Sequence, residues 1–267
     1  MRFRCCCLST FAAAAALSSP PALPSQIAYE GFGPSFPVYA NSGTGFSGAW
    51  LQGGSSVLAS RYVPSPNTLC FQRLPNSGGS ISAPAAQEIN GALRALAQPL
   101  GADNTTAYLS FLLRPQGKLS EGFLNGFFGM TLNGTAGHDL FIGKSGGGTM
   151  RQYILENRGG AGQVSSGAEI VVGRTALLVV KAQFMPGNDV FTLIVNPRPG
   201  VSEPAGGAMK TDLDVGTVSQ IGIYSTGAFS VDEIRIGTTF ADVVPGGDHA
   251  SHDDRWDDES HGCNEDR

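Results

Sequence analysis

The chain has 267 residues, of which 41% are hydrophobic and 15% are charged, and it contains 37 glycines and 16 prolines. This much glycine disfavours a helical protein, because a glycine inside a helix costs about 1 kcal/mol, but it suits short strands joined by tight turns. The net charge of -5 comes largely from the C-terminal end, and no basic stripe is present, which argues against nucleic acid as a partner.

Residues 1–26 are predicted to be a secretory signal peptide. Arginines at positions 2 and 4 precede an uncharged, alanine-rich stretch, and prolines from position 20 onward end it. This stretch is too short and too weakly apolar to span a bilayer, and no later segment approaches about 20 consecutive apolar residues. We therefore expect an exported protein, extracellular or at the cell surface, with no membrane span in the mature chain.

The first part of the mature chain, residues 27–84, is rich in glycine, serine and proline, and we expect short strands and long loops there. In the following segment, 84–100, four apolar residues recur at helical spacing: Ile89, Leu93, Leu96 and Leu100. This spacing fits a short amphipathic helix, but a strand over 92–97 fits equally well, and the two alternatives stay open.

From residue 107 onward, strand-like runs alternate with turn residues at a spacing of roughly ten residues. The predicted strands are 107–114, 127–133, 138–144, 151–156, 175–184, 190–196, 220–225 and 229–237. The run 175–184 is apolar on both faces, which is typical of a central strand. Because no long helical pattern separates these strands, the sequence predicts an all-β, antiparallel two-sheet sandwich that occupies residues 27–245 as one domain.

The last predicted strand carries a family resemblance. Residues 229–239 read Phe-Ser-Val-Asp-Glu-Ile-Arg-Ile-Gly-Thr-Thr, and they follow 211–216 and 221–224. This ending resembles the closing strands of concanavalin A-like lectin/glucanase (laminin G-like) domains, and the opening at 29–32 and 43–50 resembles the start of exported bacterial proteins of uncharacterised function with that fold. The resemblance implies a two-sheet jelly roll and an extracellular setting, but no known ligand.

Residues 246–267 form an acidic, histidine-containing tail. We expect this tail to be disordered, because it has too few apolar residues to offset the entropy of ordering. Many relatives in the resembled family end in a membrane-spanning sorting helix instead. Three of the five cysteines lie in the predicted signal, which leaves Cys70 and Cys263. We favour two unpaired cysteines, and a bridge between Cys70 and Cys263 remains the alternative.

No catalytic site is predicted. The run of alternating glutamate and aspartate that glucanases of the resembled family carry is absent. Asp232 and Glu233 are adjacent, so on a regular strand they point to opposite faces and are not expected to flank one glycosidic bond. We expect them to pair with Arg235, with turn amides or with polar groups of another strand. Asp212 and Asp214 are the alternative pair for a hydrolase or lyase, although a loop-capping role is favoured.

A second apparent motif is Gly-x-Ser-x-Gly at 143–147, which matches the nucleophile pattern of serine hydrolases at Ser145. A nucleophile elbow requires a strand that enters a helix, whereas these glycines continue into a hairpin. His138 is the one histidine outside the tail and is read as a turn residue. Neither residue is predicted to be catalytic.

Ligand and metal candidates follow from side-chain chemistry. Aromatic faces contribute much of the affinity for sugars, and Trp50, in a neighbourhood rich in glycine and serine, is the main candidate, together with Tyr39 and Tyr62. Asp139 and Asp189 offer hard oxygen ligands for a structural Ca²⁺, an ion common in the resembled superfamily.

These observations predict an exported, non-catalytic binding or surface module whose partner is a glycan or a cell-surface protein. One alternative is a glycoside hydrolase or lyase with an unrecognised carboxylate site. Another is a purely structural extracellular component. Analogy of fold does not choose among the three.

Overall fold

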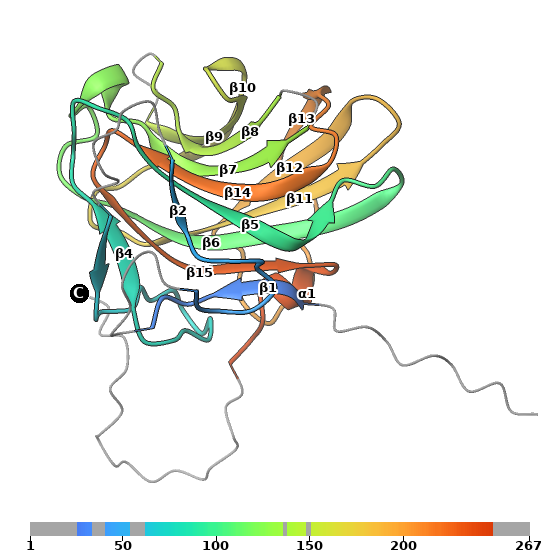
Figure 1. Cartoon of the computed structure of the whole chain (residues 1–267), viewed down its shortest axis with the longest axis horizontal. Coiled ribbons are helices and arrows are strands. Elements are labelled where there is room, and N and C mark those ends of the chain that lie inside the picture. The colour runs from blue at the N-terminus through green and yellow to red at the C-terminus, as the bar shows by residue number, and fades with distance from the viewer. Residues whose placement is uncertain (1–25, 34–40, 54–61, 136–137, 148–150, 248–267) are drawn as a thin grey trace, which may run out of the picture.

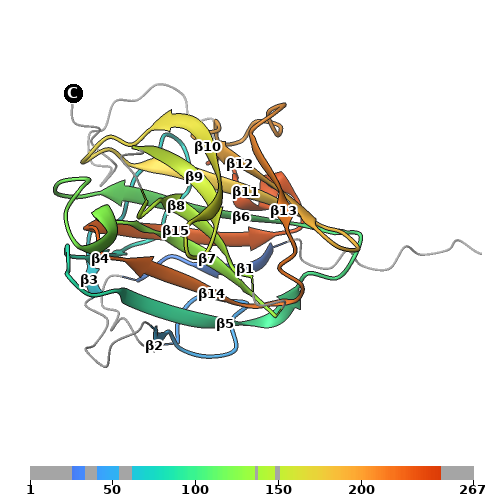
Figure 2. The same cartoon turned by 90° about the horizontal axis from the view of Figure 1, so that it is seen from above.

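A computed structural model of the chain describes residues 26–33, 41–53, 62–135, 138–147 and 151–247. These residues form two antiparallel β-sheets that stack face to face (Figure 1). Figure 2 shows the strands of one sheet crossing above those of the other. The predicted all-β, antiparallel two-sheet jelly-roll sandwich is therefore confirmed.

The eight-stranded sheet has β11 and β6 near its middle, and all its strand pairs are antiparallel. In spatial order its strands are β13 (Ala208–Leu213), β12 (Asp189–Val195), β11 (Ala176–Phe184), β6 (Thr105–Pro115), β15 (Phe229–Gly237), β4 (Ser80–Ala83) and β3 (Val63–Ser65), with β1 (Gln26–Glu30) also paired to β15. Leu178 and Val180 of β11 join the core between the sheets, and Leu177 and Val179 join a second cluster on the outer face. Both faces of β11 are therefore covered, as its apolar run predicts.

The seven-stranded sheet carries the candidate site. In spatial order its strands are β10 (Ala161–Glu169), β9 (Gln152–Asn157), β8 (Leu140–Lys144), β7 (Phe128–Gly134), β14 (Val218–Ser225), β5 (Asn90–Leu100) and β2 (Leu51–Gly53). The ambiguous segment 84–100 thus contains a strand. Its backbone pairs with β14 on one side and β2 on the other, and Ala92 and Leu96 reach the core by strand alternation.

Two strands fall in segments that the sequence left as turns or loops. β10 is polar along its length and forms an edge of its sheet, so it has little of the apolar alternation that marks a half-buried strand. β13 includes Asp212, which was expected in a loop, and it forms an edge of the other sheet. Edge strands need fewer buried side chains than central strands, which explains the weak signal of both.

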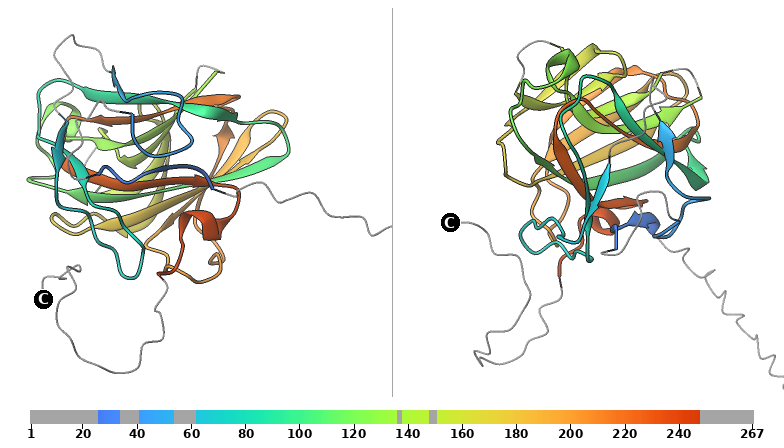
Figure 3. Two further views of the ribbon diagram at one scale, coloured as in Figure 1. Left: turned by 60° about the horizontal axis from the view of Figure 1, so that its bottom comes forward. Right: turned by 60° about the vertical axis from the view of Figure 1, so that its left-hand side comes forward.

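A smaller apolar cluster lies on the outer face of the eight-stranded sheet. There α1 (Phe240–Val243) and residues near Leu69 cover β6 and β11. Figure 3 shows α1 beneath β15 on this side of the sandwich. Among the described residues, no helix has the length and apolar character needed to cross a membrane.

Candidate functional site

The outer face of the seven-stranded sheet is hollowed by a pocket of about 390 Å³. Strand alternation sends Met130 and Ile142 into the core, so their neighbours Thr131 and Phe141 project outward. Thr131 lies opposite Phe141 on β8, and Phe141 lies opposite Glu156 on β9, so three adjacent strands present one row of outward side chains. The pocket is lined by Ile89, Leu124, Phe127, Thr131, Phe141, Gly146, Gly147, Glu156, Arg158, Gly159, Gly160 and Tyr224.

Glycines on the same outward face create part of this hollow. Gly129 and Gly143 face each other on β7 and β8, and Gly222 lies opposite Thr131. A Cβ atom on Gly222 would come within 2.6 Å of both Tyr224 Cε2 and Thr131 Oγ1. The Tyr224 ring can lean along the sheet only because residue 222 has no side chain.

Glu156 is the polar centre of the pocket. Its side chain is 5% exposed, and Oε2 accepts hydrogen bonds from Ser145 Oγ at 2.9 Å and from Gln163 Nε2 at 2.7 Å. Within the described part of the chain, Oε1 has no hydrogen-bond partner. Burial raises the pKa of Glu156, whereas the hydrogen bonds from Ser145 and Gln163 and the charge of Lys210 lower it. Glu156 therefore presents one fixed, partly desolvated acceptor oxygen to whatever occupies the hollow.

Ser145, which matches the serine-hydrolase pattern, donates its hydroxyl hydrogen bond to Glu156 in this structure. It is 1% exposed, and its hydroxyl also accepts hydrogen bonds from Gln163 Nε2 at 2.6 Å and from the Gly147 amide at 3.0 Å. It follows β8 in the connection to β9, not a strand-to-helix elbow. Its position favours orienting the carboxylate over nucleophilic attack.

Arg158 and Tyr224 also line the pocket, and they belong to a chain of three side chains that begins at Asp139. Asp139 Oδ2 accepts a hydrogen bond from Arg158 Nη1 at 2.7 Å, and the guanidinium carbon of Arg158 lies 4.3 Å from the centre of the Tyr224 ring. The Arg158 and Asp139 side chains are 44% and 17% exposed. Arg158 is thus held by an acid and an aromatic face while some of its donors remain open to solvent.

The pocket combines apolar walls with few polar groups, the usual composition of a small-ligand site. Ile89, Leu124, Phe127 and Phe141 supply the apolar surface, and Phe127 and Phe141 meet edge to face with ring centres 6.1 Å apart. Among the lining residues, Glu156 is the one carboxylate. Glycosidases that follow the usual mechanism need two carboxylates about 5 to 9.5 Å apart, and the described lining of this pocket supplies one.

The aromatic residues singled out from the sequence lie elsewhere. Trp50 is 1% exposed, stacks on Phe32 at 6.0 Å between ring centres and has the Arg94 guanidinium 5.7 Å from its ring. Tyr62 is 5% exposed and donates its hydroxyl to the Ile223 carbonyl at 3.1 Å. Both rings are buried in the core and offer no open face to a ligand in this structure. Tyr39 lies outside the described residues.

The two predicted calcium ligands are engaged by protein donors. Asp139 binds Arg158 as described above. Asp189 is 2% exposed and accepts hydrogen bonds from the backbone amides of Met185 at 3.0 Å and Val215 at 2.9 Å. Burial is the main reason that the pKa of Asp189 is raised. The described residues contain no cluster of three or more acidic, histidine or cysteine side chains that could hold a metal ion.

Asp212 and Asp214, the alternative catalytic pair, have separate partners. Asp212 Oδ1 accepts a hydrogen bond from Lys210 Nζ at 2.7 Å, and the Asp212 side chain is 56% exposed. Asp214 Oδ1 accepts a hydrogen bond from the Gly216 amide at 2.8 Å, which confirms the expected capping role. Neither residue lines the pocket described above.

Asp232 and Glu233 depart from the expected strand geometry. Asp232 pairs with Leu112 and Arg235 with Ser110, so β15 has one extra residue here, and Glu233 has a φ of 53°. This bulge invalidates the expectation of opposite faces, because both carboxylates reach the segment 68–77. The expected pairing is confirmed, since Glu233 forms an ion pair with Arg235 and Asp232 accepts a hydrogen bond from a backbone amide at 2.8 Å.

Cys70 is disulfide-bonded. This corrects the expectation of an unpaired thiol at this position. The other four cysteines all lie outside the described residues.

The sequence matches no protein-family model, and no curated protein matches it. Several solved structures are similar in backbone. The globular domain of T. cruzi calreticulin is 11% identical with a TM-score of 0.48 over 73% of this chain and 86% of that one. An endo-1,3-beta-glucanase from Streptomyces sioyaensis is 10% identical with a TM-score of 0.47 over 82% and 98%.

A GH131 beta-glucanase catalytic domain from Podospora anserina is 12% identical, with a TM-score of 0.41 over 70% of this chain and 84% of that one. At such low identities and TM-scores, these likenesses do not indicate which ligand this chain binds or which reaction it catalyses. The pocket's own residues must carry any inference about function.

Proposed function

We propose that this chain is an exported, non-catalytic carbohydrate-binding module, and that the pocket over β7, β8, β9 and β14 receives one sugar residue. The observation that carries the proposal is the Oε1 atom of Glu156. It is an acceptor held in place by Ser145 and Gln163 and left without a partner among the described residues, in a hollow whose walls are largely apolar. An acceptor that opens into a hollow in this way can be matched by a ligand that brings a hydrogen-bond donor.

A sugar ring suits these walls because it presents hydroxyl groups around its edge and C–H groups on its faces. Phe127 can contact the C–H surface, while Glu156 and Arg158 can bond to hydroxyl groups. The volume of about 390 Å³ falls within the range of about 300 to 1,000 Å³ that is typical of small-ligand sites. Export rests on the composition of residues 1–26 and completes the proposal, since extracellular glycans are the expected partners.

The proposal is tested with a glycan array followed by isothermal titration calorimetry on the sugar that binds. Glu156→Gln is expected to lower the affinity at least tenfold, because a hydrogen bond to a charged group is worth about 1.5–3 kcal/mol. Glu169→Gln is the matched control: Glu169 is an exposed glutamate on β10 that does not line the pocket, and its replacement should leave the affinity unchanged.

Failure to retain any glycan on the array would overturn the proposal, and so would unchanged affinity in Glu156→Gln. A protein partner would then be the better explanation of this surface. Chromatography of the bound sugar after prolonged incubation checks the non-catalytic part, and new products that disappear in Glu156→Gln would show turnover instead.

A further inference from the structure

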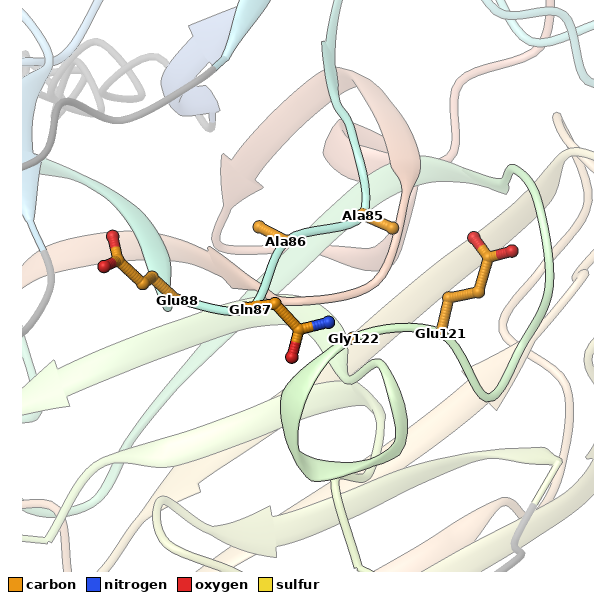
Figure 4. Close-up of a pocket in the computed structure, with 6 residues that line it drawn as sticks. All are labelled: Ala85, Ala86, Gln87, Glu88, Glu121 and Gly122. Atoms are coloured by element: carbon orange, nitrogen blue, oxygen red, sulfur yellow. The ribbon is translucent and has the colours of Figure 1, made fainter.

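A second hollow, of about 470 Å³, lies beside the pocket that contains Glu156. It is lined by Ala85, Ala86, Gln87, Glu88, Glu121 and Gly122 (Figure 4). These residues come from two segments, 84–89 between β4 and β5 and 116–127 between β6 and β7. The same two segments supply Ile89, Leu124 and Phe127 to the first pocket, so the two hollows share a continuous wall.

Backbone hydrogen bonds fasten these two segments to each other and to the end of β14. The Phe123 amide donates to the Ala86 carbonyl at 3.4 Å, and the Ala86 amide donates to the Thr226 carbonyl at 2.8 Å. Gly122 has a φ of 84°, and a Cβ atom there would lie 2.6 Å from both of those carbonyl oxygens. The floor of the second hollow therefore depends on a glycine and is fixed relative to the first pocket.

The ridge between the two hollows is apolar and exposed. It is formed by the 3₁₀ turn Phe123–Asn125, in which Phe123 and Leu124 are 49% and 50% exposed. On the far side of the ridge, Gln87 and Glu121 lie on either side of Gly122 (Figure 4). Along this surface, the polar groups of the first pocket are followed by the apolar ridge and then by Gln87 and Glu121 of the second hollow. This alternation matches a chain of sugar rings better than a single ring.

The charges of the lining indicate which sugars fit. Among the described lining residues, Glu156 and Glu121 bring negative charge to the two hollows, whereas the guanidinium of Arg158 already pairs with Asp139. A chain of uronic acids would meet like charges, which disfavours its binding. A neutral chain would meet acceptors that its hydroxyl groups can satisfy.

We infer that the ligand is a neutral oligosaccharide of at least two residues, which enters the pocket at Glu156 and continues over Phe123 and Leu124 into the second hollow. This inference rests on the proposed function of the pocket and extends it. It separates a chain-binding module from one that recognises an isolated sugar.

The test is calorimetry on the full chain with a mono-, di- and trisaccharide of the neutral sugar that the array identifies. We expect the affinity to rise at least tenfold from the monosaccharide to the trisaccharide. Glu121→Gln and Gln87→Ala are expected to remove most of this gain and to leave monosaccharide binding unchanged, which also shows that each variant is folded.

Equal affinity for all three lengths would overturn the inference while leaving the proposed pocket intact. Variants that weaken the mono- and trisaccharide equally would overturn it as well. A uronic-acid trisaccharide is expected to bind at least tenfold more weakly than its neutral counterpart, and equal or tighter binding would refute the neutral class. Loss of all binding in Glu156→Gln, together with a length effect in the wild type, supports both proposals. Absence of binding at every length contradicts the proposed function itself.

Discussion

Each sheet of the sandwich buries carboxylates on its outer face, and the two groups are satisfied in different ways. On β15, Asp232 accepts hydrogen bonds from Thr68 Oγ1 and from the Leu69 and Glu233 amides at 2.7–2.8 Å, and Glu233 is bound by Arg235, Tyr29 and the Ser77 amide. On β9, both protein donors to Glu156 use Oε2, and Oε1 is left to the pocket.

Burial of an acid is therefore not enough to identify a site in this fold. Asp232 and Glu233 are 0% exposed and hold the segment 68–77 against the eight-stranded sheet. Glu156 is almost as buried, yet it has an acceptor to spare in a hollow. The first group stabilises the fold, and the second can bind a ligand, because a carboxylate whose hydrogen bonds are all made internally has none to offer.

The largest expected effect that separates the two kinds of carboxylate is on the free energy of unfolding. Glu233→Ala leaves the buried Arg235 without its ion-pair partner and is expected to lower the free energy of unfolding by about 3–5 kcal/mol. Urea denaturation measures it. Glu156→Gln keeps an acceptor for Ser145 and Gln163 and is expected to cost no more than about 1 kcal/mol. Equal losses in the two variants would break the comparison.

The next effect is the pH dependence of stability. Burial, together with the charge of Glu233, raises the pKa of Asp232 from 3.8 to about 8. Between these two values the folded state holds a proton that the unfolded state has released, so this contribution to stability is complete below about pH 4 and is lost as the pH rises to about 8. The slope should approach 1.4 kcal/mol per pH unit at most.

Urea denaturation at several pH values between 4.5 and 7.5 measures this slope. Asp232→Asn removes the titrating group, so its stability should vary less with pH than that of the wild type, even if it is lower throughout. Should the wild type gain stability over this interval, or the Asn variant keep the full slope, Asp232 is not the group responsible.

The smallest expected effect concerns Asp139, which holds the lining residue Arg158 by an ion pair. Asp139→Asn removes the ion pair with Arg158, which is partly exposed, so the free energy of unfolding should fall by no more than about 1 kcal/mol. Arg158 would be held less firmly over Tyr224, and sugar affinity should fall about two- to fivefold. Calorimetry on the same ligand checks this value. A loss as large as that in Glu156→Gln would mean that Arg158 is the principal recognition group.

The strands that carry the site were predictable. The runs 138–144 and 151–156 were expected as strands. Within each strand, alternation decides which side chains share a face with Phe141 or with Glu156. Their facing each other was not predictable, since it depends on the register between β8 and β9. Gln163 was out of reach as well, because it lies on β10, whose polar sequence gives no strand signal.

For the aromatic candidates, the sequence suggested exposed side chains where the structure has buried ones. Trp50 and Tyr62 lie in or near segments rich in glycine, serine and proline, a composition that suggests an exposed loop, yet both rings pack in the core. Composition reports on the flexibility of the backbone nearby, and it does not report on which way a side chain turns.

The sequence by itself determined the class of fold and most of the central strands, because side-chain alternation in long apolar runs is a local property that only a buried sheet satisfies. Tertiary structure alone decided the rest: the bulge that turns Asp232 and Glu233 to the same side, the register that aligns Thr131, Phe141 and Glu156, and the two hollows along the segments 84–89 and 116–127. These features depend on contacts between residues far apart in the chain, and no local pattern encodes them.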